Sequence, residues 1–560
     1  MVSLWGSGKK DDDERDDQDD HQVEDETDQR ATSSRSQPAR PSDDANERTR
    51  LLPRHEQGVG YLSPDDPAVS LLFVPPRVLA QLTGGQVSPY NLWSVRALRW
   101  FEVLFLMISC LWWVLLFISI FVSPPQMHSR GSGFFDVAYT TLTIGNILTA
   151  LLFFATPSAA MSILSMAISV LLLIDMIIIL AVSRIRAEEG WIGIASVIWA
   201  ALIGFYNVVT NRTVKWGKAE EEERLTGRQE TRRTLREWCA VFTATFLMTV
   251  YVVIAILLTA TLVLRSRDAT LPAPGKRYLV DGDKYRVHLA CVGQQTFTPD
   301  GKPKPTVLLE GGYMPVEHTF QPWVHETYEN GTIDRYCYWD RPGLAWSDNA
   351  PSPHSAGMSA DAISEALAIS GEDGPWILVS AGIGTVYSRV FSARHPRVIA
   401  GMMFIDGLHE DLLYKIASPG RGFILWGRGI ISPLGLDRLA GALFKGRTKE
   451  DRVYGRSSYQ GGKFLKNKLQ ENLVADSLTK NEVVSARNIQ DPKVPLVVVT
   501  SGVHLRRDKD WERKQEDITK VTENLVAWDI VKGAPPEEIW RSPEGRQIME
   551  KRLGQLYKGH

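Results

Sequence analysis

Residues 377–387 read "ILVSAGIGTVY", and this stretch indicates the fold of the second half of the chain. The apolar run 377–379 is typical of a buried strand, and the segment that begins near Thr385 is typical of a helix. Gly382 and Gly384 lie between them, where a sharp turn needs residues that tolerate unusual backbone angles. The stretch therefore predicts a strand, a tight turn and a helix in direct succession.

Similar apolar runs, separated by helical patterns, recur from residue 276 onward. The sequence Asp281-Gly282-Asp283 between the first two runs is a turn signal and predicts a hairpin. Unbroken apolar strands separated by helices indicate a mostly parallel sheet covered on both faces. The expected strands are KRYLV (276–280), KYRVHLACV (284–292), TVLLE (306–310), RYCYWD (335–340), WILVS (376–380), AGMMFID (400–406), PLVVVT (495–500) and NLVAWDIV (524–531).

Taken in order, these segments resemble the α/β-hydrolase family over residues 276–556, about half of the chain. "LLEGG" (308–312) matches a strand and the oxyanion loop, which implies that Gly311 and Gly312 belong to that loop. "YWDRPGLAWSD" (338–348) resembles the stretch after the next strand, with Ala345 in place of a glycine. Residues 411–490 occupy the usual position of a cap insertion and could either cover the pocket or rest on a bilayer.

The catalytic residues of that family are missing from the positions that the resemblance assigns. The family's elbow reads Gly-x-Ser-x-Gly, and alignment places Gly382 where the nucleophilic serine should stand. Pro536 lies where the histidine is expected, and Asp406 is the possible remnant of the acid. Acyl transfer needs a nucleophile and a base, so we expect no catalytic residues here and a role in binding or scaffolding. A membrane-bound lipid or ester hydrolase or acyltransferase with non-standard residues is the alternative.

Two of the four cysteines, Cys291 and Cys337, fall on strands that are neighbours in the resembled sheet. A disulfide between them would suit an oxidising compartment, and two free buried cysteines are the other possibility. The chain has no Cys-x-x-Cys pair of the zinc type, and we expect neither a metal nor another cofactor.

Five apolar stretches are long enough to cross a bilayer as helices. They imply a helical membrane bundle over 99–264, a linker over 265–275 and the α/β domain over 276–560. The expected spans are 100–122, 134–155, 159–183, 190–210 and 239–264.

Basic residues set the expected orientation of this bundle. They are concentrated before the first span and in the loop 211–238, which places that side and the N-terminus in the cytosol. Residues 265–560 would then lie in a lumen or outside the cell. Asn330, in Asn-Gly-Thr, is a glycosylation acceptor on that far side.

The N-terminal region contains a candidate sorting signal. Residues 1–65 are acidic and lack apolar periodicity, so we expect disorder, followed by a linker over 66–98. Glu47 with Leu51 and Leu52 resembles an acidic dileucine signal, whose reader is a coat adaptor, although chance occurrence in a polar tail is the alternative. A functional signal would direct the protein to a vacuolar, lysosomal or other endomembrane.

The overall layout also resembles uncharacterised fungal multi-span proteins labelled mitochondrial integral membrane proteins. A mitochondrial membrane is therefore the alternative location, although the acid-rich start is unlike a presequence. A net charge of −2 gives no field for nucleic acid. The expected partners are membrane lipids, and a second membrane protein is a further candidate.

Three acidic residues lie within or at the edges of the expected spans. Asp175 is deep in "LLLIDMIII", where an ionisable group is either functional, as in a transporter component, or hydrogen-bonded to a neighbouring helix. Glu102 and Asp136 lie near span ends, where we expect solvation.

Overall fold

The computed structural model describes residues 92–226, 233–536 and 538–559. The expected disordered tail 1–65, most of the linker 66–98 and the candidate signal at Glu47, Leu51 and Leu52 lie outside the described residues. These expectations remain predictions.

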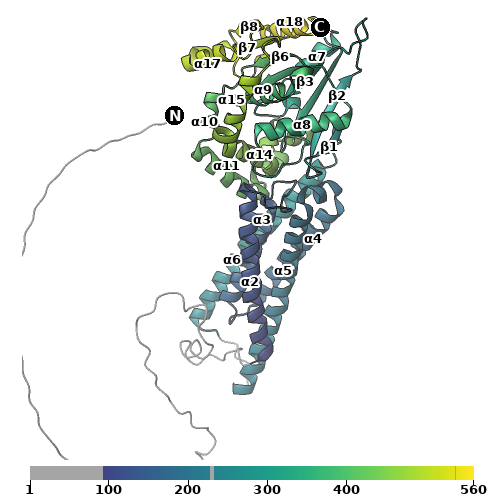
Figure 1. Cartoon of the computed structure of the whole chain (residues 1–560). Helices are drawn as coiled ribbons and strands as arrows, with labels where there is room; N and C mark the ends of the chain where they lie inside the picture. The colour runs from purple at the N-terminus through teal and green to yellow at the C-terminus, as the bar shows by residue number, and fades with distance from the viewer. Residues whose placement is uncertain (1–91, 227–232, 537, 560) are drawn as a thin grey trace, which may run out of the picture. The chain divides into compact units, whose positions relative to one another are not determined.

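Five long apolar helices account for the expected membrane spans (Figure 1). The helices are α2 (Trp93–Phe121), α3 (Phe134–Leu152), α4 (Ala159–Ala181), α5 (Ser183–Thr226) and α6 (Leu235–Asp268). Their number is confirmed among the described residues, and three of the helices (α2, α5 and α6) have boundaries that differ from the expected ones by several residues.

The fourth span is the one most different from its expected range of 190–210. Helix α5 runs through more than half of the expected cytosolic loop 211–238, because the charged residues after 210 continue the helix. Its backbone breaks at Gly190, where φ is +64°. Helix α6 begins at Leu235 behind a capping box formed by Thr234 and Glu237, and it extends into the expected linker 265–275.

The acidic residues of the bundle lie inside it. Glu102 and Asp136 are 0 % and 1 % exposed, so the expectation that they are solvated is wrong. For Asp136 the reason is close helix packing: a Cβ added to Gly193 of α5 would lie 2.8 Å from its Oδ1. Asp175 of α4 is also buried, and Tyr139 Oη of α3 donates a hydrogen bond to its Oδ2 at 3.1 Å.

The second half of the chain forms an eight-stranded sheet in the order β1-β2-β4-β3-β5-β6-β7-β8. Strand β2 pairs antiparallel with β1 and β4, and all other neighbours are parallel, as expected for an α/β-hydrolase-like sheet. The hairpin through Asp281-Gly282-Asp283 is confirmed. The strands are β1 (Lys276–Val280), β2 (Tyr285–Gly293), β3 (Thr306–Glu310), β4 (Arg335–Asp340), β5 (Trp376–Ala381), β6 (Ile399–Ile405), β7 (Leu496–Ser501) and β8 (Leu525–Val531).

Helices cover both faces of this sheet, and each face has its own apolar core. Helices α8 (Ala356–Ser370), α9 (Gly384–Arg394) and α15 (Lys480–Ile489) contribute to the first core. Helices α7 (Gln321–Glu329) and α18 (Pro543–Lys558) contribute to the second. Successive side chains of a strand enter opposite cores. The strands are therefore apolar at nearly every position, which explains the continuous apolar runs of the sequence.

The insertion between β6 and β7 is helical and reaches the membrane bundle. Its helices are α10 (Leu413–Ile416), α11 (Pro419–Ile431), α12 (Leu436–Phe444), α13 (Lys449–Val453) and α14 (Gly462–Val474), followed by α15. Lys463 Nζ of α14 lies 3.5 Å from Glu188 Oε1 of α5, and Ser352 Oγ of the α/β domain donates to Ile120 O of α2 at 3.0 Å. The cap and the α/β domain therefore both contact the bundle.

Candidate functional site: the elbow and its charged cover

The turn after β5 has the geometry that the sequence predicts. Gly382 has φ +52° and its N–H donates to Ile405 O at 3.0 Å, while α9 starts two residues later. A Cβ added to Gly384 would lie 2.5 Å from Gly311 O, so only glycine lets α9 approach the oxyanion loop. The elbow is thus present, with a glycine at the strained position that would hold the nucleophile.

The other expected remnants lie around this turn. Pro536 is in the loop that follows β8, and Ser501 Oγ fastens that loop to β7 by donating to Ala534 O at 2.7 Å. Asp406 follows β6 directly and is 1 % exposed, and its Oδ2 lies 3.6 Å from Nδ1 of His504. Sequence reasoning did not assign a role to His504, because it follows β7 and not β8.

A buried arginine occupies the space beside the oxyanion loop. Arg341 Nη1 donates to Glu310 Oε1 at 2.7 Å and also to Gly311 O, and Nη2 donates to Gly312 O at 2.6 Å. The guanidinium carbon lies 4.5 Å from the ring centre of Tyr387 on α9. Gly311 and Gly312 are therefore held through their carbonyl oxygens by a cation of the chain itself.

The cap completes this network from the other side. Glu471 Oε1 of α14 lies 3.3 Å from Arg341 Nη2, and Lys468 Nζ lies 2.9 Å from both oxygens of Glu471. Lys468 Nζ is also 4.7 Å from the ring centre of Tyr313. Two carboxylates and two cations thus alternate in a row beside the elbow, from Glu310 through Arg341 and Glu471 to Lys468. We call Glu310, Arg341, Glu471 and Lys468 the elbow network.

Burial shifts the proton affinities of this network. It raises the pKa of Glu310 to about 7 and lowers the pKa of Lys468 to about 8. Burial alone would also raise the pKa of Glu471, but Lys468 and Arg341 hold it below its ordinary value. Glu310 is therefore the carboxylate of the network whose charge changes near neutral pH.

Replacing Glu310 by Gln should flatten the pH dependence of stability. In the folded protein Glu310 keeps its proton up to about pH 7, whereas the unfolded chain loses it near 4.5, so this group makes the free energy of unfolding fall as pH rises between those values. Thermal unfolding in detergent, followed by tryptophan fluorescence, should show a smaller decrease from pH 5 to 7 in E310Q. The matched control is E538Q, an exposed carboxylate, and an E310Q slope equal to this control would contradict the assignment.

Helix α14 explains why the elbow is closed. Almost every one of its side chains is buried although its sequence, GKFLKNKLQENLV, is strongly polar. Its polar groups have partners on several surrounding segments: Asn467 Nδ2 donates to Pro342 O, and Gln470 Nε2 donates to Ala350 O. Residues 381–390 are buried as well. The cap therefore covers the elbow, whereas its helices α11 and α12 leave large apolar side chains exposed.

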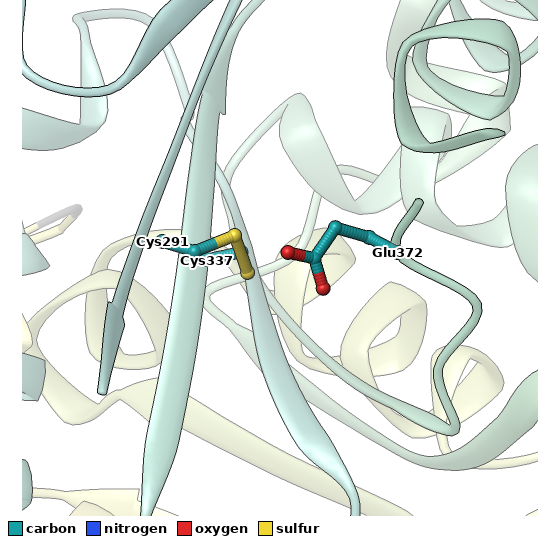
Figure 2. A group of neighbouring side chains, drawn as sticks. All are labelled: Cys291, Cys337 and Glu372. Atoms are coloured by element: carbon teal, nitrogen blue, oxygen red, sulfur yellow. A yellow bond between two sulfur atoms is a disulfide. The ribbon is translucent and has the colours of Figure 1, made fainter. Parts of the chain in front are cut away.

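Three groups of side chains have the spacing of a metal site, but their histidine and cysteine atoms already have partners. They are His288 with Glu317 and Asp340, His409 with Glu410 and Asp517, and Cys291 with Cys337 and Glu372 (Figure 2). His288 contacts Asp340 Oδ2 at 2.8 Å and Pro274 O at 2.5 Å, and His409 contacts Asp517 Oδ2 at 2.8 Å. These groups are better explained as structural links than as ligand sets.

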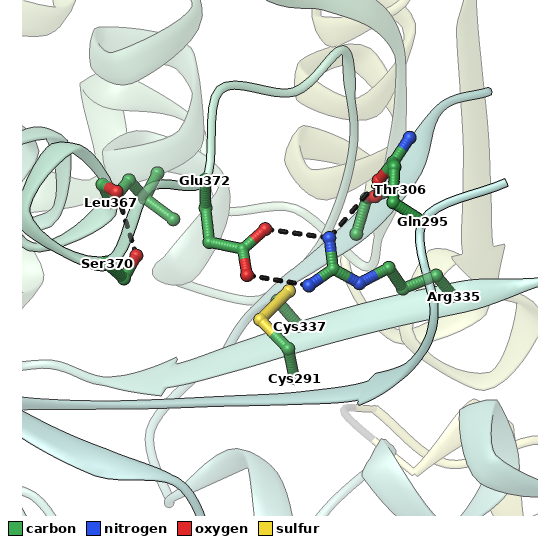
Figure 3. Close-up of a disulfide and its surroundings, with 8 residues drawn as sticks. All are labelled: Cys291, Gln295, Thr306, Arg335, Cys337, Leu367, Ser370 and Glu372. Carbon is green, nitrogen blue, oxygen red and sulfur yellow. Dashed lines mark hydrogen bonds and ion pairs between the residues drawn. A yellow bond between two sulfur atoms is a disulfide. The ribbon is translucent and has the colours of Figure 1, made fainter. Parts of the chain in front are cut away.

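The cysteines of the third group form a disulfide in the structure. Cys291 on β2 stands directly opposite Cys337 on β4, and their sulfur atoms are 2.05 Å apart. Figure 3 shows the pair beside Arg335, whose guanidinium makes two bonds to Glu372 at 2.6 and 2.7 Å. Asn330, the expected glycosylation acceptor, is exposed after α7, and its modification remains a prediction.

Comparisons with known proteins place this architecture in context. Residues 47–291 match the model of a family described as a region of unknown function (DUF2417). An uncharacterized protein of Schizosaccharomyces pombe is 33 % identical over 485 residues, covering 81 % of this chain and 89 % of that protein. An uncharacterized vacuolar membrane protein of Saccharomyces cerevisiae is 26 % identical over 59 % of this chain and 60 % of its own length.

Solved structures resemble about half of the chain. An α/β hydrolase from a deep-sea metagenome library has a TM-score of 0.36 with 12 % identity and covers 50 % of this chain and 97 % of its own. An enol-lactonase from Burkholderia xenovorans has a TM-score of 0.35 with 13 % identity and covers 50 % of this chain and 100 % of its own. The fold assignment rests on the strand order described above. The mitochondrial label expected from the overall layout stays a prediction.

Proposed function

This chain belongs to the family of the Schizosaccharomyces pombe protein, and its own residues 47–291 match the region of unknown function (DUF2417). We propose that it is an endomembrane protein whose α/β-hydrolase-like domain binds or scaffolds without catalysing. The five apolar helices and the vacuolar membrane relative support integration into an endomembrane. We further propose that the N-terminus is cytosolic and the α/β domain lumenal, as the distribution of Lys and Arg indicates.

The observation that carries the proposal is the elbow network. Gly382 offers no nucleophile, and Arg341 and Glu471 occupy the position beside the oxyanion loop with buried, mutually satisfied charges. Such charges are costly to leave unpaired in a buried site, so they favour a site that stays closed. The fold is thus used for its shape and its attachment to the bundle.

One pair of residues favours a second candidate, residual hydrolysis of an ester. Asp406 and His504 lie 3.6 Å apart close to the elbow, so His504 could act as a base toward a water molecule. Against this, the structure gives the pair no neighbouring hydroxyl nucleophile at Gly382. Hydrolysis of p-nitrophenyl esters without an initial burst of product, and its loss when His504 is replaced by Ala, would favour this candidate.

Restoring the missing side chains should not restore activity. The full-length variant with Gly382→Ser and Pro536→His has a serine at the elbow and a histidine after β8, but the elbow network and α14 still cover the site. Hydrolysis of p-nitrophenyl butyrate should therefore stay at the wild-type level. Hydrolysis that rises by about 10⁴ or more, the loss that replacing the aspartate of a working triad causes, would show that the site is open and would overturn the proposal.

A further inference from the structure

A cavity lies where the membrane helices meet the cap, and the residues of the elbow turn do not line it. Its volume is about 100 Å³, which is room for a phosphate group. It is lined by the ends of α3, α5 and α6 on one side and by the loop after β4 and the cap on the other. Because these helix ends mark where the spans finish, the cavity lies at the depth expected for lipid headgroups.

Positive charge exceeds negative charge around this cavity. Among the described residues that line it, the cations are Arg184, Arg265, Arg438, Arg452 and Lys463. In the described part of the chain, the carboxylates within ion-pair distance of these five are Glu188, Glu189 and Asp268. Five cations thus share three carboxylates.

The sharing is uneven and leaves cations incompletely neutralised. Arg438 and Arg452 both depend on Asp268, at 2.6 and 2.5 Å, and their side chains are only 15 % and 7 % exposed. Glu188 is shared by Arg265 at 3.1 Å, by Lys463 at 3.5 Å and by Arg184 at 3.6 Å. Cations so far from water favour an additional anion, and guanidinium groups match the oxygens of phosphate well.

Two buried hydroxyl groups point to the same conclusion independently of charge. Thr261 of α6 and Ser458 of the cap both line the cavity and are 2 % and 5 % exposed. Within the described residues neither hydroxyl oxygen has a hydrogen-bond partner. Buried hydroxyls are normally satisfied, so a ligand with acceptor oxygens would supply what these two lack.

An apolar groove adjoins the cavity. It is open, measures about 790 Å³ and runs between α6 and α12, with Leu264 on one wall and Leu439 and Leu443 on the other. Arg452 lines both the groove and the cavity. At the end of α12, Leu443 and Phe444 are 75 % and 84 % exposed, as expected for side chains that meet lipid.

We propose that this composite site binds an anionic phospholipid, with its phosphate in the cationic cavity and an acyl chain in the groove between α6 and α12. The charge excess favours a phosphomonoester headgroup, which carries more negative charge than a phosphodiester. The proposal rests on the binding role proposed above and names its ligand class. Its test does not involve the elbow, so a failure here and a failure of the non-catalytic assignment are distinguishable.

The test uses the delipidated full-length protein in detergent micelles, to which dioleoyl phosphatidic acid, dioleoyl phosphatidylcholine or inorganic phosphate is added. Native mass spectrometry measures bound lipid, and thermal unfolding measures stabilisation. Phosphatidic acid should bind at least about tenfold more tightly than phosphatidylcholine, and inorganic phosphate should stabilise less than the lipid because it leaves the groove empty.

Variants separate the parts of the site. Arg438→Gln should weaken phosphatidic acid binding by about tenfold or more, and Thr261→Val, which keeps the side-chain shape, should weaken it several-fold. Lys445→Gln is the matched control: it removes a cation from the exposed end of α12, outside both the cavity and the groove, and should bind like wild type. Ala442→Trp should block the groove and so reduce lipid binding while leaving the response to inorganic phosphate.

Equal affinity for phosphatidic acid and phosphatidylcholine would overturn the proposal. So would a Thr261→Val variant and a folded Arg438→Gln variant that both bind phosphatidic acid as tightly as the wild type. If Arg438→Gln does not fold, Thr261→Val alone decides. Stabilisation by inorganic phosphate that equals the effect of the lipid, or an Ala442→Trp variant that binds lipid normally, would overturn the assignment of the ligand as a lipid.

Discussion

Replacing Arg341 by Met should lower the free energy of unfolding by about 3–5 kcal/mol, the range for removing one partner of a buried ion pair. The side chain of Arg341 is 1 % exposed. Its guanidinium pairs with Glu310 and Glu471 and donates hydrogen bonds to two backbone carbonyl oxygens. Met fills most of the volume of the Arg341 side chain. The lost free energy of unfolding therefore comes from acceptor oxygens left without a donor, and not from a cavity. Thermal or urea unfolding of the purified full-length protein measures it.

The matched control for this change is Arg513→Met. Arg513 also pairs with an aspartate, but its side chain is 74 % exposed, and such pairs contribute about 0–1 kcal/mol. Adding Glu310→Gln to Arg341→Met should recover part of the loss, because one unpaired carboxylate is removed with its partner. An Arg341→Met variant as stable as the Arg513→Met control would show that the elbow network does not exist in the folded protein.

Replacing both Cys291 and Cys337 by Ala should lower the free energy of unfolding by about 4 kcal/mol, because the unfolded chain regains the entropy of the loop that the disulfide closes. The two residues are 46 positions apart and join neighbouring strands on the antiparallel side of the sheet. The same loss should follow reduction of the wild-type protein. Denaturation in urea, with and without reductant, measures both effects.

The control pair for the disulfide is Cys110 and Cys239, the two exposed free cysteines. Replacing both by Ala should change stability little. A maleimide reagent should label two cysteines of the unfolded protein before reduction and four afterwards. Four labelled cysteines without reductant, in protein extracted directly from its native membrane, would mean that the bridge is not formed and would remove one support for a lumenal domain.

The strands and the elbow could be predicted from sequence because their signals are local. Each of the eight strands is an apolar run of a few residues, and the elbow needs only such a run followed by Gly382 and Gly384. The opposition of Cys291 and Cys337 was expected only because the resembled fold makes their strands neighbours. The number of spans likewise follows from segment length and composition.

The chemistry of the site could not be predicted, because it depends on contacts between distant segments. Arg341 lies 130 positions from Glu471, and Lys463 lies 275 positions from Glu188. The polar sequence of α14 does not indicate that the helix is buried on nearly all sides. The burial of Glu102 and Asp136 could not be predicted for the same reason, because position along a span does not reveal which face of the helix packs against another helix.

The central claim is that the elbow has no reactive nucleophile, and labelling with a fluorophosphonate probe tests it most directly. The purified full-length protein, folded in detergent and compared with an active serine hydrolase in the same micelles, should show no covalent adduct by intact-mass analysis. The account predicts this because Gly382 stands where the resembled family has its serine, and the elbow network lies beside it. A stoichiometric adduct on any serine, abolished when that serine is replaced by Ala, would contradict it.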